Sequence, residues 1–121
     1  MGGIMSEKPG TAQFSMAYRC PLEHEAEGDR FFANHAEWMR RTHPTEGDEA
    51  LLHYTVSKQR DDDGVRFLLC ETYATMAGAE NHSRLAVIDQ EEGGTQLADF
   101  HAFAAKCDTI GGRSEMLHTL W

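Results

Sequence analysis

Residues 50–73, ALLHYTVSKQRDDDGVRFLLCETY, are the stretch that decides the fold. Apolar and polar residues alternate on both sides of the polar segment RDDDG, residues 60–64, which is typical of two half-buried strands joined as a hairpin. One face of the second strand is expected to carry Val65, Phe67, Leu69, Glu71 and Tyr73. Glu71 is the exception among core-like side chains, because a buried carboxylate must be paired or hydrogen-bonded.

The first strand of the hairpin alternates in the same way, and one face is expected to carry Leu52, Tyr54 and Val56. Leu51 would lie on the opposite face, together with Leu68 and Cys70 of the second strand. This outer face is too apolar to contact only water, and a second copy of the sheet would cover it. The pattern therefore predicts a two-fold homodimer.

Two helical regions, the second of which consists of two pieces, and two further strands are expected around the hairpin. Residues 11–20 alternate like a half-buried strand, and residues 25–41 place apolar side chains at helical spacing. Segments 76–89 and 95–107 are also expected to be helical, and SEMLHTLW, residues 114–121, is expected to form the last strand after the break IGGR. The order β-α-β-β-α-β is the ferredoxin-like α+β arrangement, with helices on one face of a four-stranded antiparallel sheet.

The length of 121 residues indicates one domain, with residues 1–10 as a flexible N-terminal segment and 11–121 as the folded domain. A formal net charge of −9 argues against non-specific binding to nucleic acid or to an anionic membrane surface. Three widely spaced cysteines without a CxxC pair favour a reduced, cytoplasmic protein with free thiols. No apolar run reaches the length of a transmembrane span.

Several short motifs surround the hairpin: HAEW at residues 35–38, ETY at 71–73, the pair NH at 81–82 and ADFHAFA at 98–104. Together with the hairpin, they make residues 11–121 similar to the antibiotic biosynthesis monooxygenase family of dimeric α+β barrels. The resemblance implies a homodimer with one pocket per subunit, set between sheet and helices. Typical members oxidise phenolic or quinol substrates with O2 and use neither metal nor flavin.

Two other activities are open within the same fold, because a fold alone does not determine function. One related branch binds and degrades haem, and another group has no assigned chemistry. The alternatives are therefore a non-catalytic ligand-binding or accessory protein and, as a minor alternative, a haem protein. The haem branch carries an Asn on the first strand, where this chain has Gln13 and Ser15.

Oxygenation without a cofactor needs an electron-rich aromatic substrate, a base that removes its proton, and donors that stabilise the resulting anion. The candidates for the catalytic groups are His82, Glu71 and His35. Glu71 on the helix-facing side of its strand and His82 on the sheet-facing side of its helix are expected to be neighbours. Such a pair could also be purely structural, and His35 could be a satisfied core histidine.

The candidates for contacts with a small aromatic substrate are Trp38, Tyr54, Tyr18, Asn81, Phe31 and His118. Core packing, a cap or a surface position would explain each of these residues as well. No HExxH, HxH or Cys/His ligand spacing occurs, so no metal is expected. A three-dimensional metal site formed by His35, His82 and Glu71 stays open as an alternative.

Overall fold

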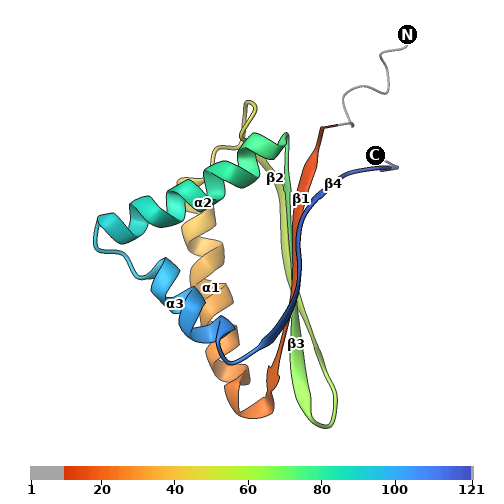
Figure 1. Cartoon of the computed structure of the whole chain (residues 1–121), viewed down its shortest axis with the longest axis vertical. Coiled ribbons are helices and arrows are strands. Elements are labelled where there is room, and N and C mark those ends of the chain that lie inside the picture. Colours follow the sequence, from red (N-terminus) through yellow and green to blue (C-terminus); the bar gives the residue numbers. More distant parts are fainter. Residues whose placement is uncertain (1–9, 121) are drawn as a thin grey trace.

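The computed structural model describes residues 10–120 and contains one four-stranded antiparallel sheet (Figure 1). The strands are β1 (Ala12–Pro21), β2 (Leu51–Arg60), β3 (Gly64–Tyr73) and β4 (Asp108–Glu115), in the spatial order β2-β3-β1-β4. This arrangement confirms the predicted ferredoxin-like α+β fold. The flexible segment expected at residues 1–10 lies, except for Gly10, outside the described residues.

All helices lie on one face of the sheet (Figure 1). They are the short 3-10 helix η2 (Leu22–His24), α1 (Glu25–Thr42), α2 (Met76–Glu91) and α3 (Gln96–Ala104). The break between α2 and α3 occurs where the sequence predicts it, since Gly93 adopts a φ of 90° that few other residues tolerate. None of the helices in the described part of the chain is long and apolar enough to cross a membrane.

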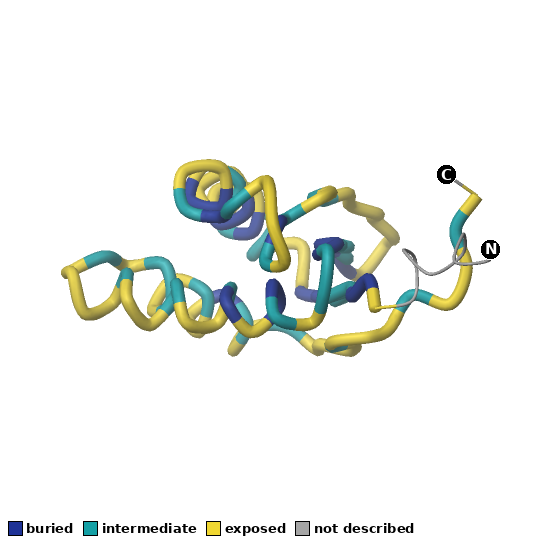
Figure 2. The backbone as a smooth tube through the Cα atoms, turned by 90° about the horizontal axis from the view of Figure 1, so that it is seen from above, coloured by how far each residue is buried: buried dark blue, intermediate teal, exposed yellow. Residues whose placement is uncertain are grey.

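The core lies between the helices and the sheet, where Figure 2 shows the buried residues of both layers. Its main cluster consists of Tyr18, Cys20, Phe31, Phe32, Val65, Phe67, Leu69 and Phe103. Helix α1 approaches the sheet closely at Gly28, where an added Cβ would come within 2.4 Å of the Phe67 ring. The absence of a side chain at this position therefore sets the spacing between α1 and β3.

The alternation predicted for β2 is wrong at its first residues. A β-bulge between Leu51 and His53 shifts the register, so that Leu51 lies opposite Tyr73 and Tyr54 lies opposite Glu71. Leu51 therefore shares a register position with a core residue of β3 instead of belonging to the outer face. A bulge adds one unpaired residue to a strand, and simple alternation does not reveal it.

The last strand also differs from its prediction. It spans Asp108–Glu115 rather than residues 114–121, and it passes through the glycine pair that was expected to break the chain. An added Cβ at Gly111 would come within 2.1 Å of the Ser15 carbonyl oxygen on β1. Glycine is therefore needed here for the close approach of two strands, and it does not mark a turn.

The face of the sheet opposite the helices is not covered by any element of residues 10–120 (Figure 1). Leu68 and Cys70 are partly buried on it, and the polar groups beside them are mutually paired: the Gln13 amide donates to the Thr72 hydroxyl at 3.3 Å. This combination of apolar side chains and paired polar groups is compatible with contact to a second copy of the chain. The homodimer stays a prediction.

Candidate active site

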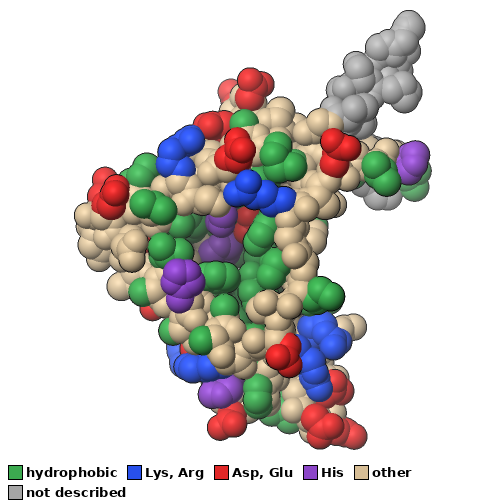
Figure 3. Space-filling model, viewed as in Figure 1, with side chains coloured by type: hydrophobic (Ala, Val, Ile, Leu, Met, Phe, Trp, Pro, Cys, Tyr) green, Lys and Arg blue, Asp and Glu red, His purple; other side chains and the backbone are tan. Residues whose placement is uncertain are grey.

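A cavity of about 340 Å³ lies between the helices and the helix-facing side of the sheet. Its walls are mostly aromatic and aliphatic: Phe14, Tyr18, Phe31, Trp38, Leu69, Leu97 and Phe100 are among them. Figure 3 shows the opening of this hollow, with hydrophobic side chains on its walls and histidine side chains at its depth. A volume of this size and an apolar lining are typical of small-molecule sites.

Glu71 is the acidic group of the cavity. It projects from β3, its side chain has no exposed surface, and the Tyr73 hydroxyl donates to its Oε1 atom at 2.5 Å. The other oxygen, Oε2, is buried and has no hydrogen-bond partner among the described residues. Burial raises the pKa of Glu71 to about 7, against the lowering effect of the Tyr73 hydrogen bond.

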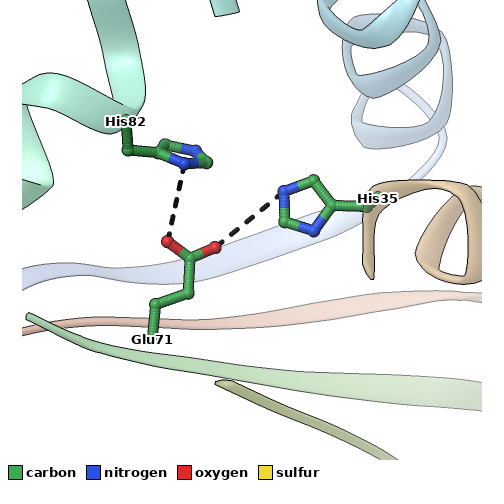
Figure 4. A group of neighbouring side chains, drawn as sticks. All are labelled: His35, Glu71 and His82. Atoms are coloured by element: carbon green, nitrogen blue, oxygen red, sulfur yellow. Dashed lines mark ion pairs between the residues drawn. The ribbon is translucent and has the colours of Figure 1, made fainter. Parts of the chain in front are cut away.

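Two histidines face this carboxylate from different helices (Figure 4). The Nε2 atom of His35 on α1 lies 3.9 Å from Oε2, and the Nδ1 atom of His82 on α2 lies 3.8 Å from Oε1. The predicted proximity of Glu71 and His82 is therefore present. Both distances are longer than a hydrogen bond. A small group can therefore bridge the carboxylate and either imidazole.

Each of these imidazoles has a further polar contact on its Nδ1 atom. His35 Nδ1 lies 2.7 Å from the Tyr54 hydroxyl, and His82 Nδ1 lies 2.9 Å from Nε2 of His43. Burial lowers the pKa of His35 and His43 to about 4 and that of His82 to about 3, and neighbouring histidines add to the effect on His35 and His82. The histidines are therefore neutral at neutral pH, and Glu71 is the group that titrates there.

The predicted site residues divide into two groups. His82, Glu71, His35, Trp38, Tyr18 and Phe31 line one cavity. Tyr54 lies behind His35 as its hydrogen-bond partner, and Asn81 is buried and accepts a hydrogen bond from Arg84. His118 is exposed and follows the end of β4, because the strand that should have oriented it ends at Glu115.

Three polar residues near the cavity were not among the predicted site residues. His43 follows the end of α1 and is outside any helical or strand periodicity. Arg113 lines the cavity from β4 and donates to the Ser83 hydroxyl at 3.1 Å, and it was hidden by the interpretation of IGGR as a break. Gln96 at the start of α3 also lines the cavity, and its buried Oε1 atom has no partner within residues 10–120.

No protein-family model and no curated protein matches the chain by sequence. Comparison with solved structures finds SnoaB, a cofactor-independent oxygenase from Streptomyces nogalater, in a point variant, at a TM-score of 0.61 and 16% identity over 92% of this chain and 97% of that chain. A candidate antibiotic biosynthesis monooxygenase from Caulobacter crescentus gives a TM-score of 0.63 and 17% identity over 98% and 100% of the two chains.

The chain has the fold of the antibiotic biosynthesis monooxygenases. The resemblance inferred from the sequence motifs is thereby confirmed at the level of the fold. A hydroxynitrile lyase from Passiflora edulis is also similar to this chain in fold, at a TM-score of 0.56 and 11% identity over 93% of this chain and 98% of that chain. The fold thus accommodates different chemistries, and the function has to be argued from the cavity.

Proposed function

We propose that the protein is a cofactor-independent monooxygenase that acts with O2 on a small phenolic, quinol or polyketide-type aromatic substrate. The observation that carries the proposal is the buried Glu71 carboxylate, whose Oε2 atom has no partner and belongs to a cavity with aromatic walls. The likeness to SnoaB supports the same chemistry. Trp38 and Phe31, which could have filled the cavity, line it instead.

Glu71 would remove the proton that starts the reaction. A base is most effective when its pKa lies near the working pH, and the pKa of Glu71 is raised to about 7. The substrate carbanion or phenolate then transfers an electron to O2. For a CH2 group of an anthrone-type ring, one oxygen atom ends in the new carbonyl and the other in water, so O2 is the only oxidant required.

His35 and His82 would stabilise the anion that forms. If the Tyr54 hydroxyl donates to Nδ1 of His35, the neutral ring carries its proton on Nε2, the atom that faces Glu71. An N–H donor in a water-poor cavity favours the charge of the deprotonated substrate. His82 is the second imidazole beside the carboxylate, and its lowered pKa suits a neutral hydrogen-bonding partner better than a strong base.

The test is O2 uptake with a panel of hydroquinones and anthrones. Glu71→Gln is expected to lower the rate by about 10²–10⁴, the range that general bases contribute, while His118→Ala, which removes an exposed imidazole, should match the wild type. His82→Ala should lower the rate as well. Unchanged uptake in Glu71→Gln would contradict the proposed role of the carboxylate.

The same set of experiments also tests the two alternative functions, a ligand-binding or accessory protein and a haem protein. Wild-type protein that binds the aromatic compounds without consuming O2 would support the ligand-binding or accessory function instead. Haemin added to the protein tests the haem alternative, because binding shifts the Soret band. Both measurements need no variant and can precede the kinetic work.

The proposal includes a homodimer in which the uncovered sheet face contacts a second copy. Sedimentation equilibrium should give twice the chain mass of 13.6 kDa. Leu68→Arg places a charge on the partly buried outer face and is expected to shift the protein towards the monomer, whereas Arg66→Lys on the same face should not. A wild-type monomer at all concentrations would contradict this part of the proposal.

A further inference from the structure

His35, Glu71 and His82 also form a donor set that suits a metal ion. One ligand atom from each residue can be chosen such that all three lie within 4.8 Å of one another. The three residues come from α1, β3 and α2, so no local sequence motif contains them. Two imidazoles and one carboxylate are ligands that first-row transition ions such as Zn²⁺ accept.

The distances within the cluster leave room for an ion. Ligand atoms at about 2.0–2.2 Å from a shared ion are about 3–3.5 Å apart in tetrahedral or octahedral geometry. The separations of 3.9 Å between His35 Nε2 and Glu71 Oε2 and of 3.8 Å between His82 Nδ1 and Glu71 Oε1 are slightly larger. These two distances join different carboxylate oxygens, and one ligand atom from each residue lies within 4.8 Å of the others, so movements of up to about 1 Å would bring the three residues to ligand geometry.

A second observation points to a ligand at the same place. Glu71 has no exposed side-chain surface, yet its Oε2 atom lacks any hydrogen-bond partner in the described part of the chain. An orphaned buried carboxylate oxygen is costly, so a group that satisfies it is expected. Oε2 is the atom that faces His35 Nε2 in Figure 4.

One of the two imidazoles, His35, has a hydrogen-bond partner on its far ring nitrogen, as metal-binding histidines usually have. The Tyr54 hydroxyl can accept a hydrogen from Nδ1 of His35, which leaves the Nε2 lone pair directed at the cluster. In His82, Nδ1 is the nitrogen near Glu71 and also the nitrogen that lies 2.9 Å from Nε2 of His43, so an ion bound there would replace the contact with His43. The cluster lines the cavity, so a bound ion would keep open positions on that side.

We propose that His35, Glu71 and His82 bind a divalent first-row transition ion of the Zn²⁺ type at the end of the cavity. This inference goes beyond the proposed function and does not depend on it. Glu71 cannot accept a substrate proton while it binds the ion. Such an ion would therefore inhibit the cofactor-independent reaction, and its removal would restore the reaction.

The test uses full-length, chelator-treated protein titrated with Co²⁺, whose visible ligand-field bands report on nitrogen and oxygen ligands, followed by displacement with Zn²⁺. One ion per chain is expected. Glu71→Gln and His35→Ala should each weaken binding by more than about tenfold, the lower limit for changes next to metal ligands. His118→Ala is the matched control, since it removes an imidazole that is exposed, and it should bind like the wild type.

Circular dichroism and urea unfolding establish that each variant is folded. Tyr54→Phe adds a readout that a purely structural cluster would not give, because it should weaken binding and alter the Co²⁺ spectrum while all three ligands remain. Absence of stoichiometric Co²⁺ bands in the wild type would overturn the proposal, and so would unchanged binding in Glu71→Gln. The spectrum requires no substrate, so its result is separate from that of the O2-uptake test.

Discussion

The space between the helices and the sheet has two regions that differ in what fills them. In one region Phe32, Phe67 and Phe103 pack ring against ring, with centroid separations of 5.3–5.8 Å. In the other, His35 and His82 face Glu71 beside a cavity of about 340 Å³, and His43 contacts His82. Phe31 contacts both, because its ring stacks on Phe103 and on His35. The comparison separates residues that stabilise the fold from residues that bear the chemistry.

The largest change in the free energy of unfolding is expected from Phe103→Ala in the aromatic region. The side chain is completely buried, and truncation of such a Phe costs about 3–5 kcal/mol of unfolding free energy. Urea unfolding measures the loss. Phe103 does not line the cavity, so O2 uptake per folded molecule should be retained. A variant with normal stability would show that the aromatic region is not the stabilising one.

In the histidine region, Glu71→Gln should raise the free energy of unfolding, whereas Phe103→Ala lowers it. Because the pKa of Glu71 is raised from 4.5 to about 7, its ionised form above pH 7 destabilises the fold, and a neutral amide avoids this cost. We expect a gain of about 1–3 kcal/mol at pH 8. The cost develops between pH 4.5 and 7, so the gain should shrink as the pH falls through this range and vanish below pH 4.5. A loss of stability at pH 8 would indicate that the carboxylate is needed for packing.

His43→Gln should change how stability depends on pH. The pKa of His43 is lowered to about 4 in the folded protein, so between about 4 and 6.5 the unfolded chain binds a proton that the folded chain does not. Its contribution is present above pH 6.5 and is lost as the pH falls towards 4. In chelator, wild-type unfolding free energy should depend on pH more steeply than that of the variant, by up to about 1.4 kcal/mol per unit.

The test is urea unfolding of the wild type and of His43→Gln at pH 5 and pH 6. His101→Gln is the control, because that histidine is exposed on α3. Parallel pH profiles for the wild type and His43→Gln would show that His43 already binds its proton in the folded state. The histidine region would then be more polar than the structure indicates.

Much of the site could be predicted from periodicity alone. Alternation along β3 placed Glu71 on the buried face, and helical spacing in α1 placed His35 among the apolar residues of the core side. Both rules work because a strand buries every second residue and a helix buries one arc. The fold itself followed from the order of these patterns.

The features that the sequence did not predict are those in which a single residue interrupts the regular alternation of a strand or the spacing of a helix. The bulge before His53 changes the register of β2, and Gly111 continues a strand where glycine usually suggests a turn. Because the sequence predicts the last strand at residues 114–121, it indicates His118 as a site residue and not Arg113. His43 could not be predicted, since its contact with His82 joins residues that are 39 positions apart and belongs to the tertiary fold alone.

The hydrogen bond from Tyr73 to Glu71 joins two residues of a single strand, two positions apart. Because both side chains belong to β3, any shift of α1 or α2 alters the distances to His35 and His82 and leaves this bond in place. The sheet therefore holds the acid, while the helices adjust its surroundings. Substitutions in the helices could tune the working pH of such a site, or its choice between a proton and a metal ion, without rebuilding the group that carries the charge.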